Sequence, residues 1–330
     1  MRLDNISNQA YDILALSFLK GLGKQSILKL IKDTPYSDNL LISTLDILGN
    51  NKYSEAEIYS AKEKADEQIS MVKKLGHYLI CYLDHQFPKS LKATHDAPIL
   101  LFCHGDIDLL NRDSVTVIGT RSPTAHGEVI TKRVTDWAVK NDWVVTSGLA
   151  KGVDTLAHKQ CIESGGKTIS VMAQGLNKVY PAINKKLASS IVESGGLLIT
   201  EYIYDGYVGK SNFVERDRIQ AGLSKAVILV QSGLNGGSLH ASRAILKYYR
   251  PLVVVGQSKS DALANEENIK ANQVLLSNNN LERSNLLKVT LEQTNNIFRL
   301  NNKYLFSDAK DLINSIDFEK NKNTSLDMFT

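Results

Sequence analysis

Hydroxyl groups, cations and glycines occur together at several points in this chain, each time shortly after a run of apolar residues. Glycine lets the backbone come close to an anion, and backbone N–H groups, hydroxyls and cationic side chains can then hold it. This combination predicts a site that binds phosphate groups. The residues concerned are Gly119, Thr120, Arg121 and Ser122; Ser147, Gly148 and Lys151; and Gly237 with Ser238.

The elements that must position these residues repeat as apolar strand, glycine-bearing loop and amphipathic helix. Strands that are apolar throughout are buried on both faces, and helices between them imply right-handed parallel crossovers. The predicted fold is α/β, an extended Rossmann-like, doubly wound parallel sheet whose strand-to-helix loops meet at the carboxyl edge. The expected strands are 115–118, 144–146, 168–172, 197–201, 226–230 and 252–255, with earlier ones at 78–83 and 98–103.

A long loop over residues 202–212 leads into a helix that carries further candidates. Arg216 and Arg218 are two residues apart, so they diverge by about 200° on a helix. We expect one arginine to face the pocket and the other to pair or pack elsewhere. Phe213, with Tyr202, Tyr204 and Tyr207 before it, could stack on nucleobases. Ordinary core packing is the alternative for Phe213.

Signatures of catalysis are missing from the sequence. No strand is followed by Gly-x-Gly-x-x-Gly or by a Walker loop, and there is no nucleophile elbow. Asp154 and His158 share a helix face, but without a third ligand we expect them to hydrogen-bond to each other rather than to hold a metal. Glu201 ends a strand without a partner in view. The sequence predicts a binding site with no metal or cofactor, and no enzyme.

The bulk composition sets only broad limits. The chain has 330 residues, a net charge of +4 and three scattered cysteines. The charge permits an anionic partner, and three cysteines are too few for a disulfide framework. No signal peptide and no membrane-spanning run is evident, so we expect a cytoplasmic protein that does not enter a membrane.

The N-terminal part reads as helical. Two helices flank a hairpin at residues 20–24 whose glycines either approach a DNA phosphate or simply permit the turn. A further helix is expected from Ser54, with Glu57 completing a capping box, to Gly76. We therefore divide the chain into a helix-hairpin-helix (SAM-like) domain at 1–76, the Rossmann domain at 77–317 and a flexible tail at 318–330. The asparagine-rich region 257–303 shows no clear pattern.

Several collinear motifs, spread over about 140 residues, resemble the DNA-processing protein A family (DprA, also called Smf). The resemblance also covers the N-terminal hairpin and the turn at 84–88, so it runs from about residue 9 to 256. The motifs are Gly119-Thr120-Arg121-Ser122-Pro123, Ser147-Gly148-Leu149-Ala150-Lys151-Gly152, Tyr180-Pro181 with Asn184, Asn212-Phe213 with Arg216 and Arg218-Ile219, and Gly237-Ser238-Leu239.

The resemblance implies a homodimer that binds single-stranded DNA without catalysis and loads the RecA recombinase during natural transformation. By position, Arg121 would contact DNA, as would Lys185 or Lys186 and one or both of Arg216 and Arg218. Asn212 would line the same site. Where the family usually has Arg-Asn-Arg, this chain has Asp217 between its arginines, which places a negative charge beside the proposed phosphate site.

An alternative is suggested by related Rossmann proteins of the LOG type, which hydrolyse nucleoside monophosphates. Their signature is Pro-Gly-Gly-x-Gly-Thr-x-x-Glu, and the matching region here is 235–241. Ala241 stands where the catalytic glutamate would be, which argues against hydrolysis and leaves a nucleotide sensor open.

The C-terminal segment Ser325–Phe329 resembles the peptide by which bacterial replication and repair proteins dock on the sliding clamp. Leu326, Met328 and Phe329 would fill an apolar groove. A tail that folds back or stays disordered is the alternative.

Overall fold

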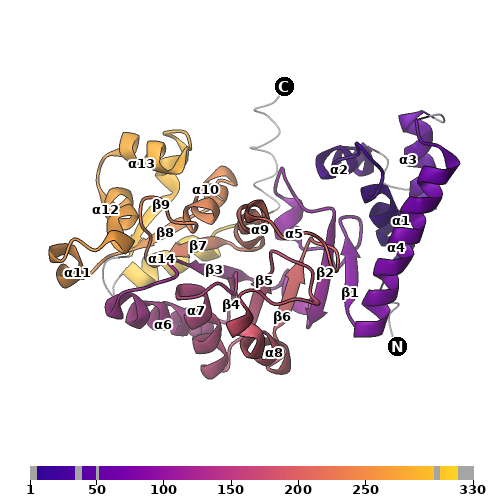
Figure 1. The fold of residues 1–330 in the computed structure, drawn as a ribbon. Coiled ribbons are helices and arrows are strands. Elements are labelled where there is room, and N and C mark those ends of the chain that lie inside the picture. The colour runs from indigo at the N-terminus through magenta and orange to yellow at the C-terminus, as the bar shows by residue number, and fades with distance from the viewer. Residues whose placement is uncertain (1–5, 34–38, 50–51, 301–304, 319–330) are drawn as a thin grey trace.

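The computed structural model describes residues 6–33, 39–49, 52–300 and 305–318, and it contains one mixed sheet of nine strands (Figure 1). The strand order is β1-β2-β6-β5-β4-β3-β7-β8-β9, and the pairs from β6 to β9 are all parallel. The strands are β1 (Tyr78–Cys81), β2 (Leu100–Gly105), β3 (Ser114–Ile118), β4 (Val144–Ser147), β5 (Thr168–Val171), β6 (Leu197–Thr200), β7 (Ala226–Leu229), β8 (Leu252–Val255) and β9 (Ile297–Leu300).

The α/β Rossmann-like fold is thus confirmed, with an antiparallel addition at one edge. β2 pairs antiparallel with both β1 and β6. The order of β3 to β6 reverses at β7, which pairs with the other side of β3. A reversal of this kind opens a crevice at the carboxyl ends of the strands, where ligands bind in doubly wound sheets.

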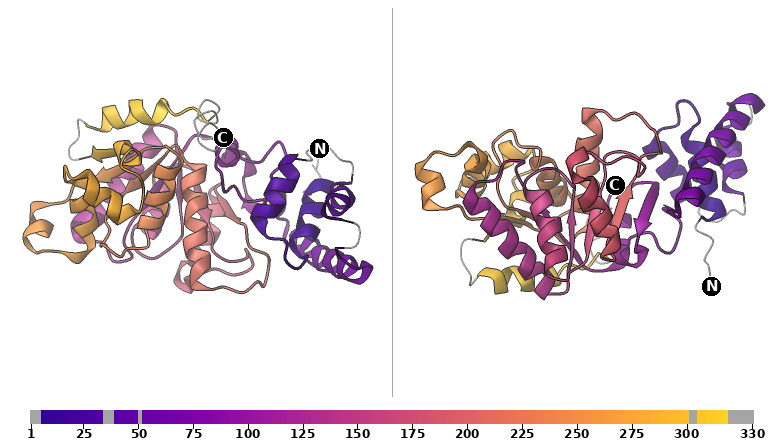
Figure 2. Two further views of the ribbon diagram at one scale, coloured as in Figure 1. Left: turned by 90° about the horizontal axis from the view of Figure 1, so that it is seen from above. Right: turned by 60° about the horizontal axis from the view of Figure 1, so that its bottom comes forward.

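Helices cover both faces of the sheet, as the two views of Figure 2 show. Val115 and Val117 of β3 pack against α6, α7 and α14, whereas Ile118 packs with α9, α10, α12 and α13 on the opposite face. This alternation follows from side chains pointing to opposite faces along a strand. The helices of the sheet region are α5 (Lys89–Lys92), α6 (Ala125–Lys140), α7 (Val153–Glu163), α8 (Lys185–Glu193), α9 (Lys210–Leu223), α10 (Leu239–Lys247), α11 (Lys259–Leu263), α12 (Lys270–Leu276), α13 (Asn280–Leu287) and α14 (Leu305–Asn314).

The N-terminal helices lie at the β1 end of the sheet (Figure 1). The capping box of Ser54 and Glu57 is present, and Gly76 ends its helix with φ of 65°. Leu14 and Leu16 share a hydrophobic core with Leu79 of β1 and Phe102 of β2. The helical region is therefore packed on the sheet rather than tethered to it. Its helices are α1 (Asn8–Ser17), α2 (Lys24–Asp33), α3 (Leu40–Leu48) and α4 (Glu55–Leu75).

Residues 257–300 form more structure than the sequence pattern indicated. They supply α11, α12, α13, the edge strand β9 and two 3₁₀ turns, η3 (Glu267–Ile269) and η4 (Gln293–Asn296). The buried Asn272 explains part of the difference, because its side chain donates to Val230 O and Val255 O and accepts from Ser232 N. A polar residue that reads as loop in the sequence here ties three segments together. Among the described residues, no helix combines the length and apolar character needed to cross a membrane.

Candidate nucleic-acid interface

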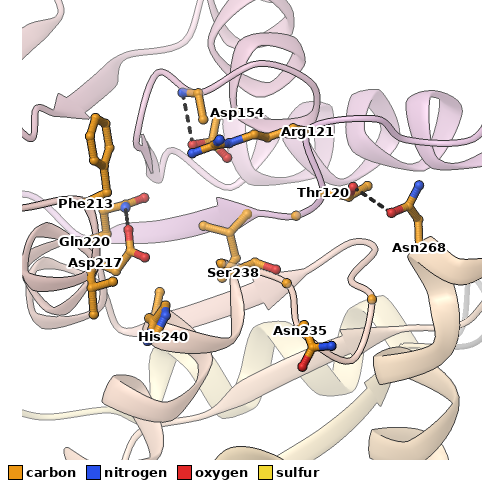
Figure 3. A pocket seen from close by; sticks show the side chains of 18 of the residues that line it. Thr120, Arg121, Asp154, Phe213, Asp217, Gln220, Asn235, Ser238, His240 and Asn268 are labelled. Carbon is orange, nitrogen blue, oxygen red and sulfur yellow. Dashed lines mark hydrogen bonds between the residues drawn. The ribbon is translucent and has the colours of Figure 1, made fainter. Parts of the chain in front are cut away.

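A pocket of about 740 Å³ opens at the carboxyl edge of the sheet, next to the reversal of strand order. Four segments line it: the loop after β3, the loop after β4 with the start of α7, the pocket-facing side of α9, and the glycine-rich loop after β7 with the start of α10 (Figure 3). Residues from the 257–300 region close one side through Glu267 and Asn268. Most of the predicted phosphate-binding residues therefore meet in one place.

Arg216 forms part of the pocket lining with a side chain that is only 6% exposed. Its Nη1 donates to Gly148 O at 2.6 Å and to Val171 O at 2.5 Å. A Cβ atom on residue 148 would lie 2.1 Å from Nη1, so glycine is required for the guanidinium to reach these carbonyls. The guanidinium of Arg216 is thus held in place by these carbonyl groups at the base of the pocket.

Two carboxyl groups flank this arginine. Asp217 Oδ1 forms an ion pair with Arg216 Nε at 3.1 Å and accepts from Gln220 Nε2 at 2.8 Å. Asp154 accepts from the backbone N–H groups of Gly148 and Ala150. Burial raises the pKa of Asp217 to about 7, with Asp154 adding to the shift and Arg216 opposing it. Burial also raises the pKa of Asp154.

Exposed cations surround these buried groups. Arg121 and Lys210 line the large pocket, and Lys151 lines an adjoining hollow of about 250 Å³ that also contains Arg121 and Arg216. Cations with free ammonium or guanidinium groups beside a glycine-rich edge suit a chain of phosphates. Exposed cations therefore form the rim of the pocket, and the buried groups beneath them carry both positive and negative charge.

The loop that carries Arg121 is held on two sides. On the inner side, Thr120 N donates to Gln231 O at 2.7 Å. On the outer side, Asn268 accepts from Thr120 Oγ1 at 3.1 Å and donates to Ser122 O at 2.9 Å (Figure 3 shows the first contact). A single asparagine therefore holds the residues immediately before and after Arg121.

Aromatic side chains border the adjoining hollow. Phe213 meets Tyr180 edge to face, with ring centroids 5.4 Å apart, and Tyr180 is 56% exposed. Phe213 is therefore half-buried at the pocket rim rather than part of the core. Tyr204, in contrast, is buried against Phe102 and His77, which removes it from the surface, whereas Tyr207 is 89% exposed.

The structure brings nine of the fifteen predicted site residues to the two adjoining hollows. These are Gly119, Thr120, Arg121, Gly148, Lys151, Phe213, Arg216, Gly237 and Ser238. Lys185 and Lys186 are exposed at the start of α8, directly after Asn184, which donates to Leu149 O. Ser122 is exposed at the outer end of the Arg121 loop.

The other three predicted residues have internal partners. Ser147 is fully buried and donates to Val117 O, and Asn212 is buried and bonds Gly209 and Tyr207 within its own loop. Arg218 donates to Glu201 Oε2 at 2.7 Å and to Asp96 O. Their side chains support the site from within. Arg216 faces the pocket and Arg218 pairs elsewhere, as the helical spacing predicted.

The expected hydrogen bond between Asp154 and His158 is wrong. His158 is buried and its Nδ1 contacts Thr168 Oγ1 at 2.7 Å, while Asp154 binds the loop after β4. Burial lowers the pKa of His158 to about 3, so the imidazole is neutral there. No group of three metal-ligating side chains occurs within the part of the chain that the structure describes.

Asn268, Lys210 and Gln220 belong to the site but were not found from the sequence. Asn268 lies in a polar stretch with no periodicity, and Lys210 stands in a loop-like run before the helix. Gln220 is a helix residue whose neighbours alone do not reveal its face. Asp217, where the resemblance leads one to expect asparagine, was the one sequence signal that this face of α9 carries a negative charge.

Comparison with known proteins assigns the family. Residues 78–282 match the family described as DNA recombination-mediator protein A, a stretch that covers more than half of the chain. The chain belongs to this family. This recombination-mediator family is the one that the collinear motifs resembled.

Individual relatives agree with the family assignment. The chain is 31% identical over 257 residues to DNA processing protein DprA of Streptococcus pneumoniae, covering 77% of this chain and 89% of the relative. It is 33% identical over 189 residues to Protein Smf of Escherichia coli, covering 57% of this chain but only 50% of the relative. The chain thus spans half the length of the latter protein.

Two solved structures share the fold. DNA processing protein A from Streptococcus pneumoniae superposes with a TM-score of 0.67 at 32% identity, covering 79% of this chain and 91% of the other. DNA processing protein A from Helicobacter pylori superposes with a TM-score of 0.53 at 29% identity, covering 65% and 97%. The Helicobacter structure addresses how that protein binds single-stranded DNA.

Proposed function

We propose that this member of the family binds single-stranded DNA at the carboxyl edge of its sheet and acts as a recombination mediator. The Helicobacter relative binds single-stranded DNA, and the pocket found here has the cations and glycines that such a ligand requires. The observation that carries the proposal is Arg121, an exposed cation on a loop held from both sides at the mouth of the pocket. A fixed loop can present its guanidinium to a phosphate with little loss of entropy.

Aromatic stacking would add to the phosphate contacts. Tyr180 and Phe213 form a partly exposed edge-to-face pair beside Lys151, and Tyr207 is exposed on the neighbouring loop. Aromatic rings contribute about 1–3 kcal/mol per stacked base without regard to sequence. Contacts to the phosphate backbone together with base stacking suit single-stranded DNA, whose bases are free to stack on aromatic side chains.

The proposed role is binding and not catalysis. Ala241 is buried in the pocket lining at the position of the LOG-type catalytic glutamate, so it supplies no acid or base. Arg216 neutralises Asp217, and backbone N–H groups hold Asp154. This arrangement favours a DNA binder over a nucleotide hydrolase, and it favours a site that needs no cofactor.

Loading of RecA, assembly as a homodimer and a place in natural transformation are proposed from the family resemblance. A cytoplasmic setting and the division of the chain at residues 76 and 317 are proposed from the sequence. Docking on the sliding clamp through Ser325–Phe329 is a separate proposal, and that segment lies outside the described residues.

The direct test is fluorescence anisotropy with labelled oligothymidine and with a duplex of equal length. We expect tighter binding to the single strand. The logarithm of the association constant should fall with the logarithm of the salt concentration, with a slope of about −0.7 per phosphate neutralised. Arg121→Ala should weaken binding about tenfold and make this slope less steep by about one phosphate.

Arg133→Ala provides the matched control, because Arg133 is an exposed arginine of α6 outside the pocket. This control variant should bind like the wild type. Preference for the duplex, or equal losses in the two arginine variants, would reject the proposed site.

A further inference from the structure

Two side chains on the pocket-facing side of α9 carry hydrogen-bond acceptors that no donor among the described residues satisfies. Asp217 and Gln220 are three residues apart, so they share a helix face (Figure 3). Gln220 Nε2 donates to Asp217 Oδ1, which orients the amide with its Oε1 unpartnered. Gln220 is 1% exposed and Asp217 is 14% exposed.

Asp217 and Gln220 each keep one acceptor oxygen without a donor. Asp217 Oδ1 already receives Gln220 Nε2 and faces Arg216 Nε, whereas no hydrogen bond to Oδ2 occurs among the described residues. Gln220 Oε1 is buried without a donor, an arrangement that costs free energy unless a ligand supplies one. This wall of the pocket therefore offers two adjacent acceptors and lacks a donor.

We propose that the pocket takes one base of the bound strand and prefers guanine, which donates to Asp217 Oδ2 and Gln220 Oε1. This inference rests on the proposed binding of single-stranded DNA and adds a base preference to it. The cationic rim at Arg121, Lys151 and Lys210 would hold the flanking phosphates, and the base would enter between Phe213 and His240. The pocket volume of about 740 Å³ leaves ample room for a purine.

Guanine is favoured because of the pattern on the Watson–Crick edge. It alone presents two neighbouring donors there, the N1–H and the 2-amino group. Adenine and cytosine each place a ring-nitrogen acceptor beside their amino group, and thymine flanks its single N–H with two carbonyl oxygens. Those acceptors would face the oxygens of Asp217 and Gln220 and be repelled. A buried site built for a donor rejects a base that lacks it.

Asp217 decides the direction of these hydrogen bonds, because an ionised carboxyl group can only accept. An asparagine there would present a donor as readily as an acceptor, because its amide carries both. Above its pKa of about 7, Asp217 is a carboxylate, which can only accept and so removes that choice. The base preference accordingly depends on the acidic residue at position 217.

The experiment uses the full chain at about pH 8, where Asp217 is mostly ionised, and oligothymidines of about 15 nucleotides, a length that suits one binding site. Each carries one central substitution: guanine, inosine, adenine or cytosine. Because each oligomer carries one substitution at the same position, the number of ways in which the protein can bind along it is the same for all four. Inosine lacks only the 2-amino group of guanine. We expect guanine to bind about fivefold tighter than adenine or cytosine, with inosine in between, because a specific base contact contributes about 1–3 kcal/mol.

Variants identify the residue responsible. Asp217→Asn should abolish the difference between guanine and adenine, whereas Glu215→Gln, an exposed carboxyl on the same helix that contacts Tyr202, should retain it. Equal affinities for all four oligomers in the wild type would overturn the inference while leaving DNA binding intact. No affinity for any oligomer, unsubstituted oligothymidine included, would instead reject the proposed function.

Discussion

At residue 217 the chain keeps an acidic side chain beside a pocket rimmed with cations. The carboxyl is tolerated because Arg216 and Gln220 contact it, although burial still raises its pKa to about 7. A group with this pKa changes charge within the physiological range. Its ionisation therefore alters the charge that an approaching phosphate meets.

This titration predicts a pH dependence of DNA binding. Below its pKa of about 7, Asp217 is neutral, and above it the carboxylate repels phosphate. Affinity for oligothymidine should thus fall about two- to tenfold as pH rises from 6 to 8, measured by anisotropy at constant ionic strength. Arg216, Arg121 and Asp154 are the charged groups around it, and burial lowers the pKa of His240, which reduces the contribution of that imidazole over this interval.

Asp217→Asn isolates the responsible group. The variant should show a nearly flat profile over the same interval, since asparagine does not titrate. If the wild type and the variant lose affinity in parallel, the pH dependence arises elsewhere.

Among the elements, η3 has the clearest connection to function, because it brings Asn268 to the Arg121 loop. Its two hydrogen bonds fix Thr120 and Ser122, so Arg121 is presented from a rigid segment. Asn268→Ala should weaken single-stranded DNA binding about three- to tenfold, since each hydrogen bond contributes about 0.5–1.5 kcal/mol. Anisotropy measures the loss.

A thermodynamic cycle distinguishes positioning from general damage. If Asn268 acts through Arg121, its removal should have no further effect in the Arg121→Ala background. Asn295→Ala, an exposed asparagine of η4 outside the pocket, should bind like the wild type. Additive losses from Asn268 and Arg121 would contradict the positioning role.

The predictability of these elements depended on their sequence patterns. Short apolar runs bounded by glycine, such as 115–118, specified the strands of the sheet, and the spacing of Arg216 and Arg218 specified that they diverge. The buried position of Arg216 was not accessible from sequence, because its acceptors on Gly148 and Val171 are 68 and 45 residues away. The role of Asn268 likewise depends on a contact 148 residues along the chain.

Over the whole molecule, one buried carboxylate connects the helical region to the pocket-bearing sheet. Glu201 directly follows β6, is 2% exposed at its side chain, and pairs with Arg218 at 2.7 Å and with Lys24 of α2 at 3.3 Å. Lys24 also lies over the ring of Tyr202. Lys24, the last residue of the hairpin at 20–24, is thus engaged with the sheet region, which favours the alternative that the hairpin glycines simply permit the turn.

This connection predicts unequal contributions to stability. Glu201→Gln removes the charge that faces Arg218, whose side chain is 19% exposed, and should lower the free energy of unfolding by about 3 kcal/mol. Lys24→Ala should cost at most about 1 kcal/mol, since its side chain is 43% exposed and solvent screens the pair. Urea unfolding followed by circular dichroism measures both changes. Asp142→Asn, which breaks the exposed pair with Arg112, is the control and should resemble Lys24→Ala. A Glu201→Gln variant as stable as this control would show that the buried pair with Arg218 contributes no more to stability than an exposed pair.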